Sequence, residues 1–301
     1  MTLRLGARGS TLSLAQTEQV ARLLAPFAEV EIRTFRTTGD RLSRLGAEIS
    51  GKGVFTKEID EALLEGRVDV GVHSLKDLPS AIPQGLALAA VPAREDARDV
   101  LLSRSGSTLA RLPAGARVGT GSPRRRAQLL AARPDLEILE ARGNVDTRIR
   151  RMREGRWDAI VLARAGLARL GRLEDICEVL PEEVMLPAIG QGALALVVRR
   201  EDGRAAEIVR RLDDPASHRA VLAERALLTC LEAGCRAPLA GHARVRGEEA
   251  VLRAAVFSPD GDRLLREEGL GRAEDPERLG RQVGEKLLAR GAAGLIAEAR
   301  A

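Results

Sequence analysis

The chain has 301 residues, of which 45% are hydrophobic and 30% charged, and its formal net charge at pH 7 is +5. This length predicts two or three domains with substantial cores, and the composition is that of an ordinary soluble globular protein. No apolar run approaches the ~18 residues of a membrane span. The low aromatic content of 2%, with no Tyr, argues against a surface that stacks nucleic-acid bases.

The first predicted strand, residues 3–8, starts almost at the N-terminus, where no basic-then-apolar signal pattern is present; we therefore expect a cytoplasmic protein. Gly9 and Ser10 follow it and precede a helical pattern that runs to Leu24. A Gly-Ser pair in this position suits a helix N-cap and an anion site.

A second strand is predicted over residues 30–37, followed by a turn-rich segment that carries Lys52 between two glycines. Thr56 is then expected to cap a helix over 57–65, with Gly66 as its stop.

The stretch from Gly71 to Pro79 carries the strongest local signal. A β-branched run over 68–72 predicts a buried strand, and it leads into His73, Ser74, Lys76 and Asp77. Polar side chains at the carboxyl end of a buried strand are where an open α/β sheet binds its ligand. Only four of the 48 basic residues are lysines. Because a compact ammonium group is not interchangeable with a guanidinium group, this rarity favours a chemical role for Lys76. A solvated loop after a strand is the competing interpretation.

A second α/β unit is predicted after a hinge at 92–96, beginning with a strand over 99–103. Residues 117–156 hold eleven Arg against five acids, a local charge of +6. Within it, a strand ends in Gly119-Thr120-Gly121-Ser122, Pro123 fits the first helical position, and three arginines follow. Free N–H groups, hydroxyls and guanidinium groups together predict an anion cradle, without the Gly-Lys-Ser/Thr ending of a nucleotide P-loop.

The same pattern of strand, basic loop and helix recurs along this unit. The strand over 138–141 precedes Arg142-Gly143-Asn144 and a helix with Arg148, and the strand over 157–163 precedes a short helix over 166–171 with Arg169. We expect these cations to gather at one sheet edge. A Gly-rich linker over 186–194 then leads into an apolar strand, and a small α+β unit follows Asp213-Asp214-Pro215, with a helix over 216–231, strands near 243–247 and 250–257, and a helix over 274–290.

Of the three cysteines, Cys235 lies in a loop beside Arg236, a setting that favours the thiolate. Cys177 and Cys230 are expected on apolar helical faces as core residues. For His73 we expect a hydrogen-bonded core residue in preference to a general base.

Taken together, the ordered motifs closely resemble the hydroxymethylbilane synthase family, also called porphobilinogen deaminase, over essentially the whole chain. The motifs that carry the resemblance are Ala7-Arg8-Gly9-Ser10, Gly51-Lys52-Gly53-Val54-Phe55, the stretch 72–79, Arg94-Glu95-Asp96, Gly119-Thr120-Gly121-Ser122 with its arginines, 139–148, Ala165-Gly166-Leu167, Gly190-Gln191-Gly192-Ala193 and Glu232-Ala233-Gly234-Cys235.

The resemblance implies an enzyme, a transferase of tetrapyrrole (porphyrin, heme) biosynthesis. Four porphobilinogen molecules would be joined head to tail with loss of ammonia, on a dipyrromethane cofactor held by a thioether to Cys235. Asp77 matches the family's catalytic aspartate, which would bind pyrrole N–H groups, stabilise the cationic azafulvene and help to protonate the departing ammonia. Lys76 would pair with substrate carboxylates and would restrain the Asp77 side chain electrostatically.

Each pyrrole ring brings an acetate and a propionate, which gives the local charge excess a physical reason. The residues implied to bind cofactor and substrate are Arg8, Ser10, Lys52, Phe55, Ser74, Thr120, Ser122, Arg124, Arg125, Arg142, Gly143, Asn144, Arg148, Arg169 and Gln191; no metal is expected. The chain departs from the family pattern at Ala7, Gly121, Pro123 and Arg236, which puts only the set of neutral donors in doubt.

The implied fold class is α/β: two doubly wound lobes of type II periplasmic-binding-protein type and a small C-terminal α+β domain. Domain 1 would comprise residues 1–95 and 193–213, domain 2 residues 96–192, with hinges at 93–97 and 188–192, and domain 3 residues 214–301. We expect a monomer without nucleic-acid or membrane partners.

Two other interpretations stay open on the sequence. A non-catalytic two-lobed ligand-binding module would bind anions without chemistry and would give Cys235 no role. A nucleic-acid binder that uses the arginines of 117–156 would show steep salt dependence.

Overall fold

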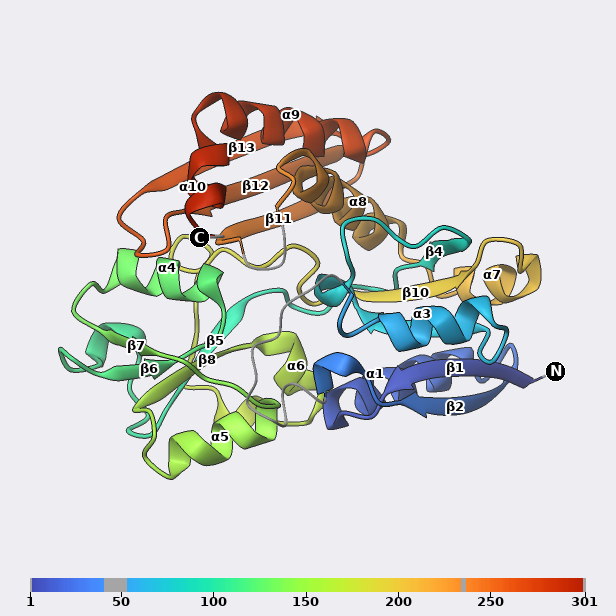
Figure 1. Ribbon diagram of the computed structural model, residues 1–301, viewed down its shortest axis with the longest axis horizontal. Coiled ribbons are helices and arrows are strands. Elements are labelled where there is room, and N and C mark those ends of the chain that lie inside the picture. The colour runs from blue at the N-terminus through green and yellow to red at the C-terminus, as the bar shows by residue number, and fades with distance from the viewer. Residues whose placement is uncertain (1, 41–52, 234–236, 300–301) are drawn as a thin grey trace. The chain divides into compact units, whose positions relative to one another are not determined.

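The structure is a computed structural model that describes residues 2–40, 53–233 and 237–299 (Figure 1). The chain divides into two compact units, Met1–Glu95 with Gly192–His218, and Asp96–Gln191 with Arg219–Ala301. The predicted division into three domains stays a prediction.

The first unit is built on a five-stranded sheet in the order β2-β1-β3-β10-β4. Its strands are β1 (Thr2–Arg8), β2 (Glu29–Phe35), β3 (Val70–Ser74), β4 (Leu86–Ala90) and β10 (Leu194–Arg199). β1 pairs in parallel with β2 and β3, whereas β10 runs antiparallel between β3 and β4. His73 and Ser74 therefore lie inside β3, and only Leu75–Asp77 leave it, in a short 3₁₀ turn, η1.

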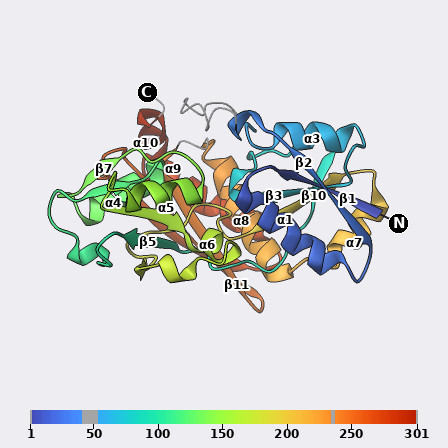
Figure 2. The ribbon, with the colours of Figure 1, turned by 90° about the horizontal axis from the view of Figure 1, so that it is seen from below.

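Helices cover both faces of this sheet, α1 (Thr11–Leu24) and α7 (Gly203–Arg210) on one side and α3 (Lys57–Leu64) on the other (Figure 2). Val20 and Leu24 of α1 pack with Val70 and Val72 of β3 in one core. The alternation of a strand sends Gly71 and His73 to the opposite face, where α3 lies. Thr56 precedes α3 as predicted, but its side chain makes no capping hydrogen bond.

The second unit holds another five-stranded sheet, in the order β7-β6-β8-β5-β9. Its strands are β5 (Asp99–Ser103), β6 (Arg117–Gly119), β7 (Glu137–Leu139), β8 (Ala159–Ala163) and β9 (Glu178–Val179), and its helices are α4 (Pro123–Ala132), α5 (Val145–Arg153) and α6 (Arg164–Arg169). Leu129 of α4 packs in the core on one face, and Ile149 of α5 and Leu167 of α6 pack in the core on the other. β5 is antiparallel to both of its neighbours.

The two sheets have the same plan: three parallel strands, one antiparallel strand and a terminal strand. This order is that of the type II periplasmic-binding-protein lobes, so the predicted fold class is confirmed.

The C-terminal part of the second unit is a three-stranded antiparallel sheet, β11-β12-β13. Its elements are α8 (Pro215–Cys230), β11 (Leu239–Arg246), β12 (Glu249–Phe257), β13 (Leu264–Arg272), α9 (Pro276–Ala289) and α10 (Ala292–Glu298). Leu227 of α8, Val283 of α9 and Ile296 of α10 share one core with the sheet. Phe257 on β12 packs with Ala127 and Leu186, which belong to the preceding lobe of the same unit, residues 96–191.

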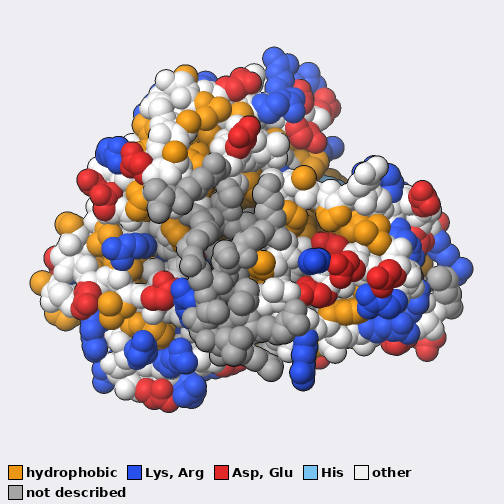
Figure 3. Space-filling model, in the orientation of Figure 1, with side chains coloured by type: hydrophobic (Ala, Val, Ile, Leu, Met, Phe, Trp, Pro, Cys, Tyr) orange, Lys and Arg blue, Asp and Glu red, His pale blue; other side chains and the backbone are white. Residues whose placement is uncertain are grey.

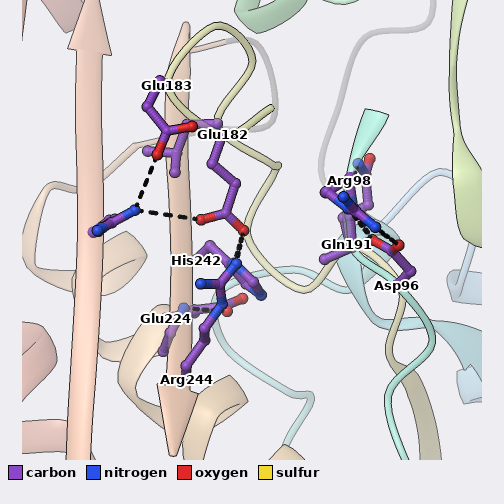
Figure 4. Close-up of polar contacts among 12 residues, drawn as sticks. Asp96, Arg98, Glu182, Glu183, Gln191, Glu224, His242 and Arg244 are labelled. Carbon is purple, nitrogen blue, oxygen red and sulfur yellow. Dashed lines mark hydrogen bonds and ion pairs between the residues drawn. The ribbon is translucent and has the colours of Figure 1, made fainter. Parts of the chain in front are cut away.

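Glu182 joins that lobe to the C-terminal sheet (Figure 4). Its carboxylate accepts a hydrogen bond from Nδ1 of His242 at 2.8 Å and another from Arg244, both on β11, and Arg253 on β12 lies 3.8 Å away. Burial acts to raise the pKa of Glu182, but the His242 hydrogen bond and the two guanidinium groups outweigh it, so that this pKa lies below its usual range.

Replacing Glu182 by Ala is expected to lower the free energy of unfolding by about 1–3 kcal/mol, because the buried face of His242 loses its partner. The Glu182 contribution is present above the unfolded-state pKa and is lost as pH falls through the lower folded-state pKa. The difference in thermal midpoint between wild type and variant should therefore shrink in acid. A difference that grows as pH falls would contradict this account. Glu183→Ala, at the exposed neighbouring carboxylate, is the control.

No helix in the described part of the chain combines the length and the apolar character needed to cross a membrane.

Candidate functional site

In the first unit, Asp77 and Arg8 come from neighbouring strand ends. Arg8 is the last residue of β1, and Asp77 ends the turn that follows β3; because β1 and β3 are parallel neighbours, their carboxyl ends meet. Nη1 of Arg8 lies 3.6 Å from Oδ2 of Asp77, and the Asp77 side chain is 30% exposed. The pair is thus accessible to a ligand.

A second carboxylate and an aromatic ring fix the guanidinium of Arg8. Nη2 of Arg8 donates to Oδ1 of Asp40 at 2.6 Å, and the guanidinium carbon lies 4.1 Å from the centre of the Phe55 ring. Gly39 has no side chain to obstruct this ring, since a Cβ there would lie 2.2 Å from it. Asp40 is a site residue that sequence reasoning missed. The feature of the sequence that could have pointed to it is its position in the turn-rich segment.

Ser10 and Ser74 are held by local hydrogen bonds. Ser10 caps α1 by accepting from the backbone N–H of Ser13 at 3.3 Å, and the Ser74 hydroxyl pairs with the side-chain amide of Gln16 at 2.9 Å. The Ser10 hydroxyl still has its own proton to donate after accepting this bond. Lys76 is exposed. Lys52 lies outside the described residues.

In the second unit, the predicted anion cradle begins as expected. Ser122 caps α4 by accepting from the N–H of Arg125, Pro123 stands at the first helical turn, and Thr120 accepts from the N–H of Ser122 at 3.2 Å. Asn144 caps α5 in the same way, through the N–H of Thr147 at 2.9 Å. Two predicted turns are therefore built as helix starts with hydroxyl or amide side chains.

Arg124 and Arg125 are buried against Asp99, which sequence reasoning missed. Arg124 and Arg125 each donate to Asp99 at 2.7 Å, and Gln191 donates to the same carboxylate at 3.0 Å and to the Ala97 carbonyl at 2.7 Å. Asp99 is fully buried; burial acts to raise its pKa, but the two guanidinium groups outweigh this and hold the pKa below its usual range. Three of the predicted binding residues thus share one internal carboxylate, and their role as ligand-binding residues stays a prediction.

Arg142 and Arg148 lie at the start of α5 around Gly143. Gly143 has φ 107°, in the left-handed region that favours glycine, and its carbonyl accepts from Nε of Arg148 at 2.8 Å.

Burial, with a smaller contribution from Arg125, lowers the pKa of Arg148 to about 10, and Glu140 opposes this shift. Glu140 is also the partner of Arg142, at 3.0 Å. Arg148 stays charged at neutral pH, and a cation disfavoured by burial and by a like charge gains from an anionic ligand.

Arg169 is half-buried in the last turn of α6. Basic side chains also lie on the surface of this lobe, over the α5 side, where carboxylates are interspersed with them (Figure 3). Among the described residues, no group of three or more His, Cys, Asp or Glu side chains could hold a metal ion.

Cys235 lies outside the described residues, but the chain that leads to it is defined. α8 ends at Cys230, and Glu232 follows with φ 47°, the left-handed conformation that usually falls to glycine at this point. The N–H of Ala233 bonds back to the Leu228 carbonyl at 3.3 Å and closes the helix end. A non-glycine residue held in this region stores strain, and such strain concentrates at functional sites.

The other two cysteines are half-buried. Cys230 ends α8, whereas Cys177 lies in the loop before β9 and not on a helix, which corrects the expectation; the Ser103 N–H donates to its sulfur at 3.3 Å.

Comparison with known proteins identifies the family. Residues 3–207 match the family model described as "Porphobilinogen deaminase, dipyromethane cofactor binding domain", and residues 218–289 match "Porphobilinogen deaminase, C-terminal domain". The curated relatives include porphobilinogen deaminases from Rubrobacter xylanophilus, 54% identical with 98% of this chain and 96% of that protein covered, and from Geobacter sulfurreducens, 46% identical with 98% and 94% covered.

Among solved structures, the chain is similar to a periplasmic binding protein from Brucella ovis, at 20% identity and a TM-score of 0.41, with 77% of this chain and 69% of that chain covered. The matches of the two family models and of the curated relatives confirm the resemblance seen in the motifs. The chain therefore belongs to the porphobilinogen deaminase family.

Proposed function

We propose that Asp77 is the catalytic carboxylate of this enzyme, that Arg8 and the arginines of the second lobe bind the carboxylates of its rings, and that Cys235 is the cofactor attachment point. The family's reaction joins four porphobilinogen molecules head to tail, with release of ammonia, to give the linear tetrapyrrole hydroxymethylbilane. This chain is an enzyme of that transferase class, and its cofactor is dipyrromethane. The observation that carries the proposal is the accessible Asp77 carboxylate beside Arg8 at adjoining strand ends.

Asp77 has the right chemistry for the loss of ammonia. When the aminomethyl group of porphobilinogen leaves as ammonia, positive charge develops on the pyrrole and is shared with its ring N–H. A fixed carboxylate within hydrogen-bond reach of that N–H stabilises the charge as it forms, and it assists the proton transfer that the departing amine needs. The contact with Arg8, itself held by Asp40 and Phe55, orients the carboxylate.

The second lobe has the donor set that acetate and propionate groups require. Arg142 and Arg148 are guanidinium groups near a helix start, Thr120 and Ser122 carry hydroxyl donors, and the cation at Arg148 is disfavoured without an anion. We assign Arg124, Arg125, Arg169 and Gln191 to the same binding function, with Asp99 holding the first two in place.

The residues present fit a dipyrromethane, whose side chains are carboxylates. When bound, the cofactor supplies the free pyrrole carbon to which the next ring is joined. The thiolate of Cys235 would hold it by a thioether bond, which water does not cleave under ordinary conditions. Lys52 and Phe55 belong to the segment that we assign to covering the bound rings, and Lys76 to pairing with substrate carboxylates.

Cys235→Ser is expected to fold but to carry no cofactor and to have no activity. The measurement is a colour reaction for pyrroles on the purified, denatured protein, together with ammonia release from porphobilinogen. Cys230→Ser is the matched control, since it removes a thiol five residues away and should keep both signals. A Cys235→Ser protein that still carries pyrrole would show that another residue is the attachment point.

We propose further that the enzyme is a cytoplasmic monomer without nucleic-acid or membrane partners. Residues 93–97 and 188–192 are the proposed hinges between domain 1 (1–95 with 193–213) and domain 2 (96–192), and domain 3 (214–301) carries Cys235.

A further inference from the structure

Two buried titratable side chains lie close together between α3 and β3, the strand that leads to Asp77. Nε2 of His73, on β3, lies 4.0 Å from Oδ1 of Asp60, on α3, and the two side chains are only 2% and 9% exposed. Neither atom has a hydrogen-bond partner among the residues that the structure describes. The reaction as derived above uses neither side chain.

We expect these two buried atoms, which have no other partner among the described residues, to interact with each other. A buried polar atom without a partner costs about 1–3 kcal/mol, so two of them side by side are expected to satisfy each other. The distance of 4.0 Å is beyond a direct hydrogen bond, but it closes with a shift of about 1 Å or is spanned by one water that bonds to both.

The sequence makes room for this contact. Gly71 precedes His73 by two residues on the same face of β3, and a Cβ at Gly71 would lie 2.7 Å from Nε2 of His73 and 3.1 Å from Ile59 of α3. Any larger residue would push the imidazole or the helix away. Gly71 thus leaves space for the imidazole, whose Nε2 lies 4.0 Å from Oδ1 of Asp60.

One partner lies on the strand that leads to Asp77, and the other lies on the helix that follows the Phe55 turn. β3 continues from His73 through Ser74 into the turn that carries Asp77. α3 follows directly on the turn with Phe55, whose ring supports Arg8, and Arg8 contacts Asp77. A contact between His73 and Asp60 would therefore link the strand that leads to Asp77 with the helix that follows Phe55, whose ring contacts Arg8 of β1.

We propose that Asp60 and His73 form a hydrogen-bonded pair, direct or through one enclosed water, that holds α3 against β3 and makes both of them positioning residues for Asp77 and Arg8. The role of Asp77 in this inference rests on the proposed function, whereas the pair itself does not.

Burial disfavours the charged form of both side chains. Burial raises the pKa of Asp60 to about 6, with Glu58 and Glu61 raising it further and Thr56 opposing them. Burial, with a contribution from Arg8, lowers the pKa of His73 to about 4. Interacting groups titrate as a unit, so we expect a hydrogen-bonded pair to take up one proton near pH 6, with His73 neutral above that pH.

Nuclear magnetic resonance of the imidazole nitrogens tests the pair without reference to activity. The chain has three histidines, so the His73 signals are assigned by their loss in His73→Gln. In the wild-type holoenzyme, the His73 nitrogen shifts should show a neutral, hydrogen-bonded ring at pH 7.5 and one step near pH 6. Asp60→Asn should remove that step. A His73 that titrates unchanged in Asp60→Asn would overturn the pair.

Kinetics test the positioning role. Asp60→Asn and His73→Ala are expected to lower kcat by about 10- to 10²-fold, as a misplacement of about 1 Å does, with KM nearly unchanged and full cofactor content; His73→Gln, which keeps a donor near Nε2, should recover part of the loss. Val209→Ala, at a buried residue of α7, which packs on β4 and β10, is the control for destabilisation and should keep kcat. Wild-type kcat in His73→Ala, or an equal loss in Val209→Ala, would overturn the positioning role. Failure of the proposed function would appear separately, as a wild-type protein without deaminase activity that keeps the His73 signals.

Discussion

Asp77→Asn is expected to lower kcat for ammonia release by about 10²–10⁴-fold, the range found when a positioned acid–base group is removed. The amide keeps the shape of the side chain but cannot stabilise positive charge on the pyrrole or serve the departing amine. The protein should fold normally, because the Asp77 side chain is 30% exposed and its contact with Arg8 is long, at 3.6 Å.

Steady-state kinetics on cofactor-loaded protein, with the thermal midpoint measured in parallel, checks this expectation. Glu65→Gln is the matched control: it neutralises an exposed carboxylate of the same lobe that pairs with Arg67 and should leave kcat unchanged. Asp77→Glu, which keeps the charge at a shifted position, should retain more activity than Asp77→Asn. An Asp77→Asn enzyme with a wild-type kcat would remove Asp77 from the chemistry.

Asp99→Asn is expected to destabilise the protein by about 3–5 kcal/mol, because it leaves the buried guanidinium groups of Arg124 and Arg125 without their counter-charge. The wild-type pKa of Asp99 lies below its ordinary value. Its contribution is therefore present above the unfolded-state pKa and disappears as pH falls through the folded-state pKa, so wild type and variant should converge in strong acid.

Unfolding of both proteins in denaturant at pH 7 and in acid measures this effect. Asp158→Asn is the matched control: Asp158 also accepts from an arginine, Arg117 at 3.1 Å, but both side chains are more than a third exposed, so the loss should stay below about 1 kcal/mol. Equal losses of unfolding free energy in Asp99→Asn and Asp158→Asn would contradict the account of a buried network around Asp99. A loss of ligand binding in Asp99→Asn beyond its loss of stability would support the predicted binding role of Arg124 and Arg125.

The sequence was informative where local chemistry decides structure. Ser10, Ser122 and Asn144 stand at helix starts, and Pro123 at a first helical position, because these residues satisfy free N–H groups or fit the fixed backbone angle. The buried strands of both lobes were predictable from apolar runs. β13 was not, because its segment from Leu264 to Arg272 carries four charges and lies at a sheet edge, where side chains face water.

Long-range pairing was the other limit. Nothing local to Asp99 marks it as the partner of arginines 25 and 26 residues later, because only the fold brings β5 and α4 together. Asp60 and His73 are likewise a helix residue and a strand residue with no common motif. His73 was expected to be a hydrogen-bonded core residue; it is buried, but its Nε2 lies 4.0 Å from Oδ1 of Asp60 without a hydrogen bond.

The most direct test of the central claim, that rings are added to a chain tethered to this protein, is the intact mass of the holoenzyme during turnover with limiting porphobilinogen. The account predicts a starting mass above the sequence mass by one dipyrromethane, and then a series of up to four equal steps, each one porphobilinogen less ammonia, that returns to the starting mass on release of product. Cys235→Ser should show neither the excess nor the steps. Product formation at an unchanged protein mass would contradict the tethered mechanism.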